Sequence, residues 1–302
     1  MKSVAESVTR LSAILIVRDE AHCLERCLRS VRPIADEIIV LDSGSTDETV
    51  AIAQSFGAVV EITDWPGYGP QKNRALNRAR GEWVLSIDAD EHVTPRLAAS
   101  ICAAVESPRQ DVNGYFIRFL ATWCGKPVHF GDWGRKRHLR LFRRIGARFT
   151  DVSVHEGVIC RPPYGTLDGI MIHDTITNEE EAIEKNRLYA ELGARELRAR
   201  ARGGLSSAVF HSTWALLRGF LLKGGFLDGA IGWKVAWIVA KRTWRRYRLA
   251  GQRPGVAHET GRLTLAGSFH DFDLSGASSM AVSLATIALV VALILALFDS
   301  LM

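Results

Sequence analysis

The chain has 302 residues, a formal net charge of +5, and 38 Lys and Arg against 33 Asp and Glu. This length allows one sizeable α/β domain plus an appended region. The five cysteines include no C-x-x-C pair, which argues against a zinc or disulfide framework and favours reduced thiols. The tail, residues 1–10, holds no apolar stretch of signal-peptide length, so we expect the folded body to stay in the cytoplasm.

Short apolar runs alternate with stretches of helical periodicity over the first ninety residues. Branched apolar residues predict strands over 11–17, 37–41, 58–62 and 83–87. Helices are predicted between them, over 20–31, up to about 56, and over 71–79. This alternation predicts a parallel sheet with right-handed crossovers.

Carboxylates follow two of these strands, Asp42 after the second and the pair Asp88 and Asp90 after the fourth. Open α/β sheets bind ligands at the carboxyl edge of their strands, so these groups are expected to face one crevice. Two carboxylates there can hold a hard divalent cation, which in turn can hold a diphosphate. A D-x-D is common in ordinary loops, and Asp42 alone could be a turn residue or helix N-cap. Their coincidence at one sheet edge favours the functional interpretation.

Several segments together carry a family resemblance: DSGSTDET at 42–49, QKNRAL at 71–76, WVLSIDADE at 83–91, LRLFRR at 139–144 and VHEGV at 154–158. With them the chain resembles the family 2 glycosyltransferases of the GT-A fold. Within the family it is most similar to the WaaE/KdtX-like glucosyltransferases, which extend lipopolysaccharide inner cores. The match is good over roughly residues 11–175 and loose to about 250. One departure is Asp19, where the family more often has Asn.

The resemblance implies an α/β fold of GT-A (Rossmann-like) type, a nucleotide-sugar-binding domain over 11–175 with a mixed, mostly parallel sheet. It implies a metal-dependent, inverting transfer from a UDP-sugar, with glucose as the expected sugar. Asp90 with Mg²⁺ or Mn²⁺ would stabilise the diphosphate. By the same analogy Asp88 would serve the ribose or the metal, and Asp42 the nucleobase and ribose.

Basic and amide side chains near these carboxylates are further candidates. Lys72 and Asn73 open a predicted helix and either line the donor pocket or are ordinary polar residues of a helix start. Arg140 and Arg143, with their neighbours, could bind phosphate, although alternation suggests that some of these arginines coat a solvent face. His173 and Lys185 look family-like, without a role that chemistry assigns.

A general base must accept the proton of the acceptor hydroxyl. Glu156 is the first candidate, because it lies in a strand-like stretch, 152–158, where an unneeded Glu would be costly to bury. His155 would share its site if the strand ends or bends at Gly157. A solvent-exposed Glu at a strand end is the alternative, and Asp132, in the loop FGDWG, is the competing base.

Residues 176–250 are expected to form a helical, basic, Trp-rich region. From Trp214 to Arg262 there are ten Lys and Arg against Asp228 and Glu259, with four Trp in the same stretch. No nucleic-acid recognition motif accompanies them, so nucleic acid is not an expected partner. Trp mixed with Lys and Arg is typical of a helix lying in a membrane interface; a solvated helical face is the alternative.

The run from Met280 to Phe298 is uncharged and would span about 28 Å as a helix, close to the hydrocarbon thickness. We therefore expect a single transmembrane helix over 280–298 after a linker over 251–279. Basic residues precede it, so the positive-inside rule places the enzyme body on the cytoplasmic side of the inner membrane.

These features predict a membrane-anchored glycosyltransferase whose acceptor is a lipid-linked saccharide, such as the lipopolysaccharide inner core. Two alternatives remain. One is a transferase that builds capsule or exopolysaccharide on a polyprenyl diphosphate carrier. The other is a catalytically silent GT-A scaffold at the membrane, against which the intact acidic residues argue.

Overall fold

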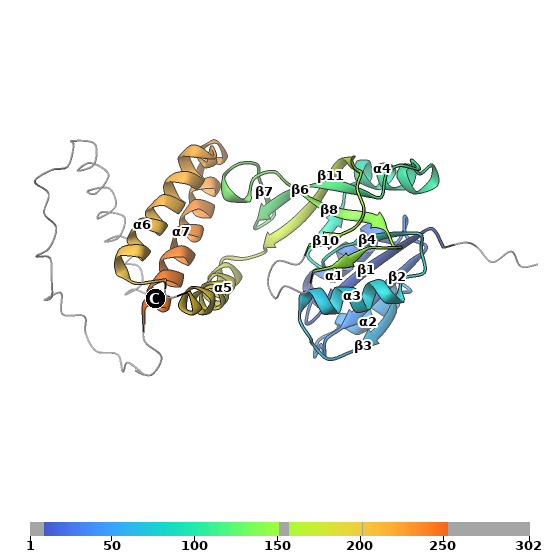
Figure 1. Cartoon of the computed structure of the whole chain (residues 1–302), viewed down its shortest axis with the longest axis horizontal. Coiled ribbons are helices and arrows are strands. Elements are labelled where there is room, and N and C mark those ends of the chain that lie inside the picture. The colour runs from blue at the N-terminus through green and yellow to red at the C-terminus, as the bar shows by residue number, and fades with distance from the viewer. Residues whose placement is uncertain (1–8, 151–156, 201, 253–302) are drawn as a thin grey trace, which may run out of the picture. The chain divides into compact units, whose positions relative to one another are not determined.

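The computed structural model describes residues 9–150, 157–200 and 202–252 (Figure 1). The chain divides into two compact units. The first comprises Met1–Pro127 and Arg135–Thr175, and the second comprises Val128–Gly134 and Ile176–Met302.

The first unit begins with the predicted alternation of strands and helices. Its elements are β1 (Leu11–Val17), α1 (Ala21–Val31), β2 (Glu37–Asp42), α2 (Thr49–Ser55), β3 (Val59–Ile62), α3 (Tyr68–Arg78) and β4 (Trp83–Ser86). β1 pairs in parallel with β2 and β4, and β2 pairs in parallel with β3. The expectation of a parallel sheet is therefore confirmed for these strands.

The sheet becomes antiparallel beyond β4. The later elements are β5 (Glu91–Val93), α4 (Pro95–Glu106), β6 (Gly114–Trp123), β7 (Lys126–Val128), β8 (Lys136–Arg143), β9 (Arg148–Phe149), β10 (Val158–Ile159) and β11 (Tyr164–Ile176). The nine-stranded sheet runs β3-β2-β1-β4-β8-β6-β11-β5, with β7 on β6. β8 is antiparallel to β4 and β6, and β11 is antiparallel to β5. A mixed sheet is confirmed, but "mostly parallel" is wrong, because among the described residues no crossover helix separates the strands from β6 to β11.

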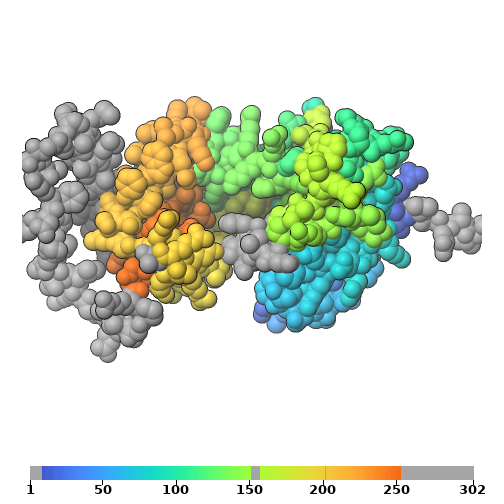
Figure 2. All heavy atoms as spheres, in the orientation of Figure 1, coloured from blue at the N-terminus to red at the C-terminus, as the bar shows by residue number. Residues whose placement is uncertain are grey.

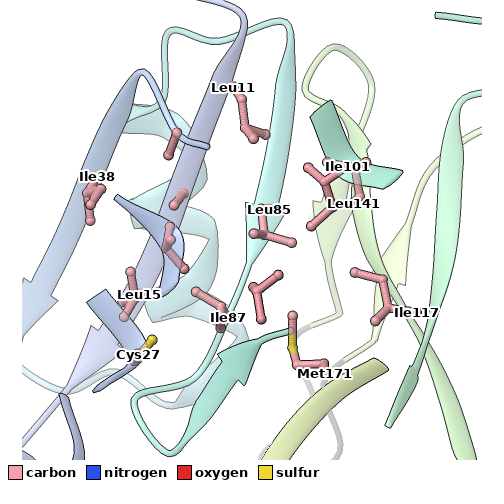
Figure 3. Close-up of a cluster of buried hydrophobic side chains, with 14 of the residues drawn as sticks. Leu11, Leu15, Cys27, Ile38, Leu85, Ile87, Ile101, Ile117, Leu141 and Met171 are labelled. Atoms are coloured by element: carbon pink, nitrogen blue, oxygen red, sulfur yellow. The ribbon is translucent and has the colours of Figure 1, made fainter. Parts of the chain in front are cut away.

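Both faces of the central strands are covered, which explains why β1 and β4 are continuous apolar runs. Leu15 and Leu85 face a core with α1 and α4, part of which is drawn in Figure 3. Ile14 and Val84 face the opposite core with α3. These two layers fix β4, and therefore the turn that follows it.

The second unit is helical in its described part: α5 (Glu179–Ala199), α6 (Leu205–Leu217) and α7 (Gly229–Gly251), with short turns η1 (Gly131–Trp133), η2 (Arg218–Leu222) and η3 (Gly225–Asp228). α5 and α6 both pack on α7. A Cβ on Gly193 of α5 would lie 2.7 Å from Nε of Arg246, so the two helices approach closely there.

The structure alters the expected membrane surface of this unit. Trp244 is 3% exposed and packs with Ala208, so it belongs to the helical core. Within the described residues, no helix has both the length and the hydrophobicity to cross a membrane. The predicted span, 280–298, and all but the first two residues of the linker lie outside the described residues.

Candidate active site

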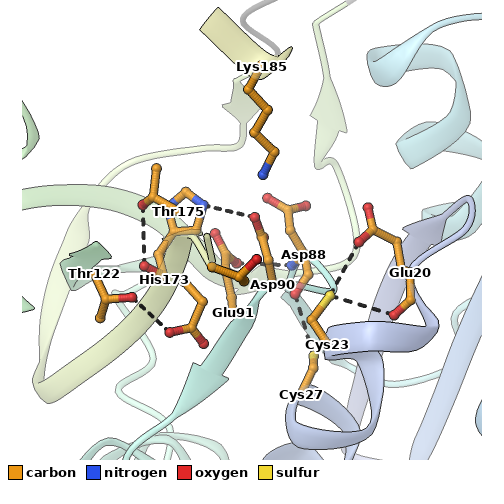
Figure 4. A network of polar contacts seen from close by, with 12 residues as sticks. Glu20, Cys23, Cys27, Asp88, Asp90, Glu91, Thr122, His173, Thr175 and Lys185 are labelled. Atoms are coloured by element: carbon orange, nitrogen blue, oxygen red, sulfur yellow. Dashed lines mark hydrogen bonds and ion pairs between the residues drawn. The ribbon is translucent and has the colours of Figure 1, made fainter. Parts of the chain in front are cut away.

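A tight turn at the carboxyl end of β4 places the acidic residues at the sheet edge (Figure 4). The amide of Glu91 donates to the carbonyl of Asp88 at 3.0 Å. The amide of Asp88 donates to the Glu91 carboxylate at 2.9 Å, and the Cys27 thiol lies 3.5 Å from the Asp88 carbonyl. The backbone from 88 to 91 is thereby fixed, with Asp88 and Asp90 at the predicted edge.

Asp88 lies between two cations. Its Oδ1 is 2.9 Å from Nζ of Lys72, and its Oδ2 is 2.8 Å from Arg140. Burial opposes its charge, but Arg140 and Lys72 together hold the pKa of Asp88 well below its ordinary value. Asp88 is therefore an anion that orders Lys72 and Arg140, and both its oxygens are already engaged.

Glu91 shares Arg140 with Asp88. Its side chain is 2% exposed, and it accepts from Arg140 at 2.7 Å. Burial, together with the negative charge of Asp88, raises the pKa of Glu91 to about 7 although Arg140 opposes the rise. Arg140 was predicted to bind phosphate; in this structure it neutralises two carboxylates and lies over the Phe119 ring at 5.4 Å.

Asp90 faces His173, whose Nε2 lies 3.2 Å from Oδ2 of Asp90. Antiparallel pairing of β5 with β11 puts His173 opposite Glu91, which brings it to the turn from 83 residues away. Burial lowers the pKa of His173, but Asp90 and the neighbouring carboxylates raise it more, so the net shift is upward. The sequence assigned no role to His173, because the pairing that places it beside Asp90 joins strands distant in the chain.

The donor chemistry at Asp90 suits a divalent cation. Asp90 and His173 are partly exposed and offer a carboxylate oxygen and an imidazole nitrogen, both ligands for Mn²⁺. Among the described residues no third His, Cys, Asp or Glu ligand atom joins this pair closely enough to complete a three-ligand cluster. Mg²⁺ and similar cations are often held by one or two protein ligands, with the remaining positions left to water and substrate phosphates.

Asp42 organises its own loop. It is 1% exposed and accepts 2.9 Å bonds from the amides of Gly44 and Ser45. Gly44 has φ of +87°, which a glycine adopts without strain. The turn interpretation of Asp42 is thus observed, and its contact with nucleobase or ribose stays a prediction.

The neighbouring loop explains the departure at Asp19. Oδ1 of Asp19 accepts from the amide of Thr46 at 2.7 Å, and the amide of Asp19 donates to Ser45 at 2.8 Å. The side chain acts as an acceptor, which Asp and Asn both supply, so these contacts do not need the amide donor lost with Asn.

Asn73 binds the backbone of β9 in both directions. Its Nδ2 donates to the Phe149 carbonyl at 3.0 Å, and its Oδ1 accepts from the Phe149 amide at 2.8 Å. β9 pairs with β10, and residues 151–156 between them lie outside the described residues, including His155 and Glu156. Asn73 therefore fixes β9, the strand that precedes in sequence the segment containing the predicted general base.

Replacing Asn73 with Ala should weaken this anchor. We expect a loss of about 1–3 kcal/mol in the free energy of unfolding, because two backbone groups lose partners. Turnover should fall with KM for the donor little changed, since the segment 151–156 loses its support. Chemical denaturation and steady-state kinetics check this. Asn73→Ala with wild-type turnover would show that hairpin position does not matter for the reaction.

Arg143 was predicted to bind substrate; the structure gives it structural partners away from the carboxyl edge, and its contact with substrate stays a prediction. It pairs with Trp83 across β8 and β4, at the amino end of β4 and away from the carboxyl edge. It forms an ion pair with Glu82 and lies over the Trp83 ring at 4.7 Å. It thus stabilises the far end of the sheet.

Asp132, the competing base, belongs to the second unit. It accepts from Arg218 at 2.9 Å and from Lys223 at 2.7 Å, and its side chain is 10% exposed. Although burial opposes its charge, these two cations lower the pKa of Asp132. A carboxylate held by two cations is a weak proton acceptor, so this environment favours a structural role.

Taken together, a mixed α/β sheet with a D-x-D turn at the carboxyl end of β4 and two cations beside it defines a GT-A-like nucleotide-binding fold. The family model for "Glycosyl transferase family 2" matches residues 12–160. An uncharacterized glycosyltransferase of Rickettsia conorii is 31% identical over 247 residues, which are 76% of this chain and 85% of that protein. The chain therefore belongs to family 2 of the glycosyltransferases, and the protein is a glycosyltransferase.

Two further proteins similar to this chain have names that state a more specific activity. The lipopolysaccharide core biosynthesis glycosyltransferase LpsC of Rhizobium meliloti is 29% identical over 264 residues, 82% of this chain and 96% of that protein. A crystal structure of glucosyl-3-phosphoglycerate synthase from Mycobacterium tuberculosis is 26% identical over 38% of this chain and 44% of that chain, with a TM-score of 0.32. That overlap is too limited to carry a structural argument.

Proposed function

We propose that this enzyme transfers a hexose, with glucose the first candidate, from a UDP-sugar to a lipid-linked saccharide of the lipopolysaccharide-core type. The proposed binding of the sugar donor is supported chiefly by the turn 88–91. There Asp90 lies beside His173, and Asp88 lies beside Lys72 and Arg140. The similarity to LpsC over nearly the whole of that protein supports the proposed class of acceptor.

The leaving diphosphate needs positive charge placed before the reaction begins. Mg²⁺ or Mn²⁺ held by Asp90, with His173, would supply Lewis-acid charge to the diphosphate oxygens. Lys72 and Arg140 add fixed positive charge at the same edge, partly neutralised by Asp88 and Glu91. Because Asp88, Asp90 and Glu91 offset these two cations, the surplus positive charge that a nucleotide diphosphate requires would come from the metal ion.

The acceptor hydroxyl must lose its proton as it attacks the anomeric carbon. Glu156 is the proposed base; in sequence it lies between the two strands of the β9–β10 hairpin, whose strand β9 is held by Asn73 through Phe149. Direct displacement from the face opposite the diphosphate inverts the anomeric centre. His155, next to it, would contact substrate from the same hairpin.

A membrane location is part of the proposal. The uncharged run 280–298 supports a single span in the inner membrane with the catalytic unit on the cytoplasmic side. A polyprenyl diphosphate carrier remains the second acceptor class. A catalytically silent GT-A scaffold is the third alternative, and the ordered cation–carboxylate network around Asp88 argues against it.

Paired substitutions of the two candidate bases test the mechanism. Glu156→Gln keeps shape and removes proton acceptance, so turnover should fall about 10²–10⁴-fold while donor binding survives. Asp132→Asn should keep the chemical step and instead lower stability by about 1–3 kcal/mol, because Arg218 and Lys223 lose their partner. Measured transfer to extracted lipid-linked saccharide, with donor binding by calorimetry, separates the two effects. Normal turnover in Glu156→Gln with an inactive, folded Asp132→Asn would transfer the role to Asp132.

A further inference from the structure

The hairpin formed by α6, η2, η3 and the start of α7 exposes an unusual number of large apolar side chains. Six of them are between 48% and 69% exposed: Phe210, Trp214, Leu221, Leu222, Phe226 and Leu227. We name these six the apolar hairpin face. Soluble surfaces rarely gather so many large apolar groups on one short segment.

α6 carries no charged residue from Leu205 to Leu217. Its inner side, including Ala208, Ala215 and Leu216, is buried in the helical unit. The outer side presents Phe210 and Trp214 one turn apart, and Leu221, in the π-helical turn η2, is exposed as well. A helix that is apolar on both sides needs a nonpolar environment on the side that its own unit does not cover.

The tip of the hairpin continues this surface. A Cβ on Gly224 would lie 3.3 Å from Leu227 and 3.5 Å from Phe130, so apolar side chains gather around that turn. Phe220 lies against Phe226 and Trp233 beneath them, at centroid distances of 6.4 Å and 5.3 Å. Two cationic side chains at the tip, Arg218 and Lys223, both pair with Asp132. This pairing reduces the free-energy cost of placing their charges next to an apolar phase.

The basic stretch of α7 is engaged within the unit instead. Arg246 lies against Gly193 of α5, and Arg248 lies over the Trp244 ring at 5.8 Å. Burial lowers the pKa of Arg242. α6 and α7 run side by side in Figure 1, and the atoms of α6 are shown as spheres in Figure 2. The exposed surface of the hairpin is therefore largely apolar, with Arg218 and Lys223 as its tip charges, whereas the sequence alone suggested a basic, Trp-rich one.

We propose that the apolar hairpin face inserts into the interfacial layer of a lipid bilayer, and that hydrophobic burial, not attraction to anionic lipid, drives this insertion. Trp214 on the outer side suits the boundary between headgroups and acyl chains. The chain itself keeps a bilayer within reach, because 27 residues separate the end of the described part, residue 252, from the apolar run at 280. The inference rests on the proposed membrane acceptor, and it adds how the helical unit meets that membrane.

The test is a position-specific probe in the full chain. An environment-sensitive fluorophore is attached to Leu222→Cys or Leu227→Cys in a Cys124→Ser background, because Cys124 is the exposed cysteine among the described residues. Glu180→Cys, exposed on α5 of the same unit, is the matched control. Vesicles of pure phosphatidylcholine contain no acceptor and no net charge, so the result is independent of whether the proposed acceptor is right.

We expect the emission at positions 222 and 227 to shift to the blue and rise severalfold on adding vesicles, in low and high salt alike, while position 180 stays unchanged. Brominated lipids should quench the inserted probes. An unshifted probe at 222 would overturn the proposal. So would a shift that needs anionic lipid and disappears in salt, since that is electrostatic adhesion. Shielding of position 222 without vesicles would mean that protein, not lipid, covers the apolar hairpin face. Shielding that vanishes on dilution would indicate a second copy of the chain, and shielding that persists would indicate the chain's own C-terminal segment.

Discussion

Asp90→Ala should reduce sugar transfer by roughly 10²–10³-fold or more while leaving the fold unchanged. Asp90 is partly exposed, and its carboxylate contacts His173 without filling space in either core. Its removal takes away the proposed carboxylate ligand of the cation. Metal stabilisation of a leaving group lowers the activation free energy by several kcal/mol, and each 1.4 kcal/mol changes the rate about tenfold. Product formation at saturating donor, with circular dichroism for the fold, measures the effect.

Asp111→Ala is a suitable control for Asp90→Ala. Asp111 is an exposed carboxylate whose partner is Arg109 at 3.3 Å, so it tests the loss of a surface charge alone. It should leave the rate within twofold of the wild type. If Asp90→Ala keeps more than roughly a tenth of wild-type activity, a loss below about 1.4 kcal/mol, Asp90 does not hold the cation.

Arg140→Met should be the most destabilising change at the site, by about 3–5 kcal/mol near neutral pH, because it leaves the buried Glu91 without its cation and Asp88 with Lys72 alone. Arg140 is 15% exposed and binds both Asp88 and Glu91. Met keeps much of the side-chain volume, so the change isolates the charge. Urea unfolding at several pH values measures the loss.

The pH dependence of this loss follows from Glu91. Its folded-state pKa is already raised to about 7 from an ordinary 4.5, chiefly by burial, and Arg140 lowers it. Removing Arg140 raises that pKa further, so the folded variant binds a proton more tightly than the unfolded chain. The deficit relative to the wild type should therefore be smallest below about pH 7, where both folded proteins keep Glu91 protonated, and should grow as pH rises above 7, where Glu91 ionises in the folded wild type before it does in the folded variant.

Arg143→Met is the matched control on the same strand. Arg143 pairs with Glu82, which is 55% exposed, so solvent screens the pair and the expected cost is about 1 kcal/mol. Catalysis should be retained, because Arg143 lies at the opposite end of β4. An Arg143→Met that unfolds like Arg140→Met, or that loses activity while folded, would contradict this assignment of the two arginines.

Local patterns in the sequence predicted the parallel part of the fold well. Apolar runs and glycine or hydroxyl-rich turns locate β1, β2 and β4 to within a residue at either end, because strands covered on both faces must be continuously apolar. The position of Asp88 and Asp90 at the carboxyl edge then follows from topology alone. The antiparallel part was less predictable, since pairing of β8 and β11 depends on contacts between distant segments.

The same distinction explains which side chains could be placed from the sequence. His173 reaches Asp90 through a strand pairing, and no local pattern marks it. Arg140 and Arg143 look equivalent in sequence, but Arg143 pairs with Trp83 at the amino end of β4, whereas Arg140 precedes Leu141, the residue that pairs nearest the carboxyl end of β4. Trp244 and Arg246 of α7 fit a lipid-facing composition, whereas packing buries Trp244 against α6 and sets Arg246, which stays 40% exposed, against Gly193 of α5. Composition reports the presence of such groups, and only tertiary packing decides their direction.

Thermal unfolding with nucleotide sugars most directly tests the central claim that the turn at 88–91 is a metal-assisted donor site. A ligand that binds only the native state at 100 times its Kd stabilises it by about 2.7 kcal/mol. We expect UDP-glucose or another UDP-hexose to raise Tm of the wild type with Mn²⁺, to do so much less with chelator, and to have little effect on Asp90→Ala. If no nucleotide sugar raises Tm, or if the rise is the same with chelator and in Asp90→Ala, the site assigned to Asp90 is wrong.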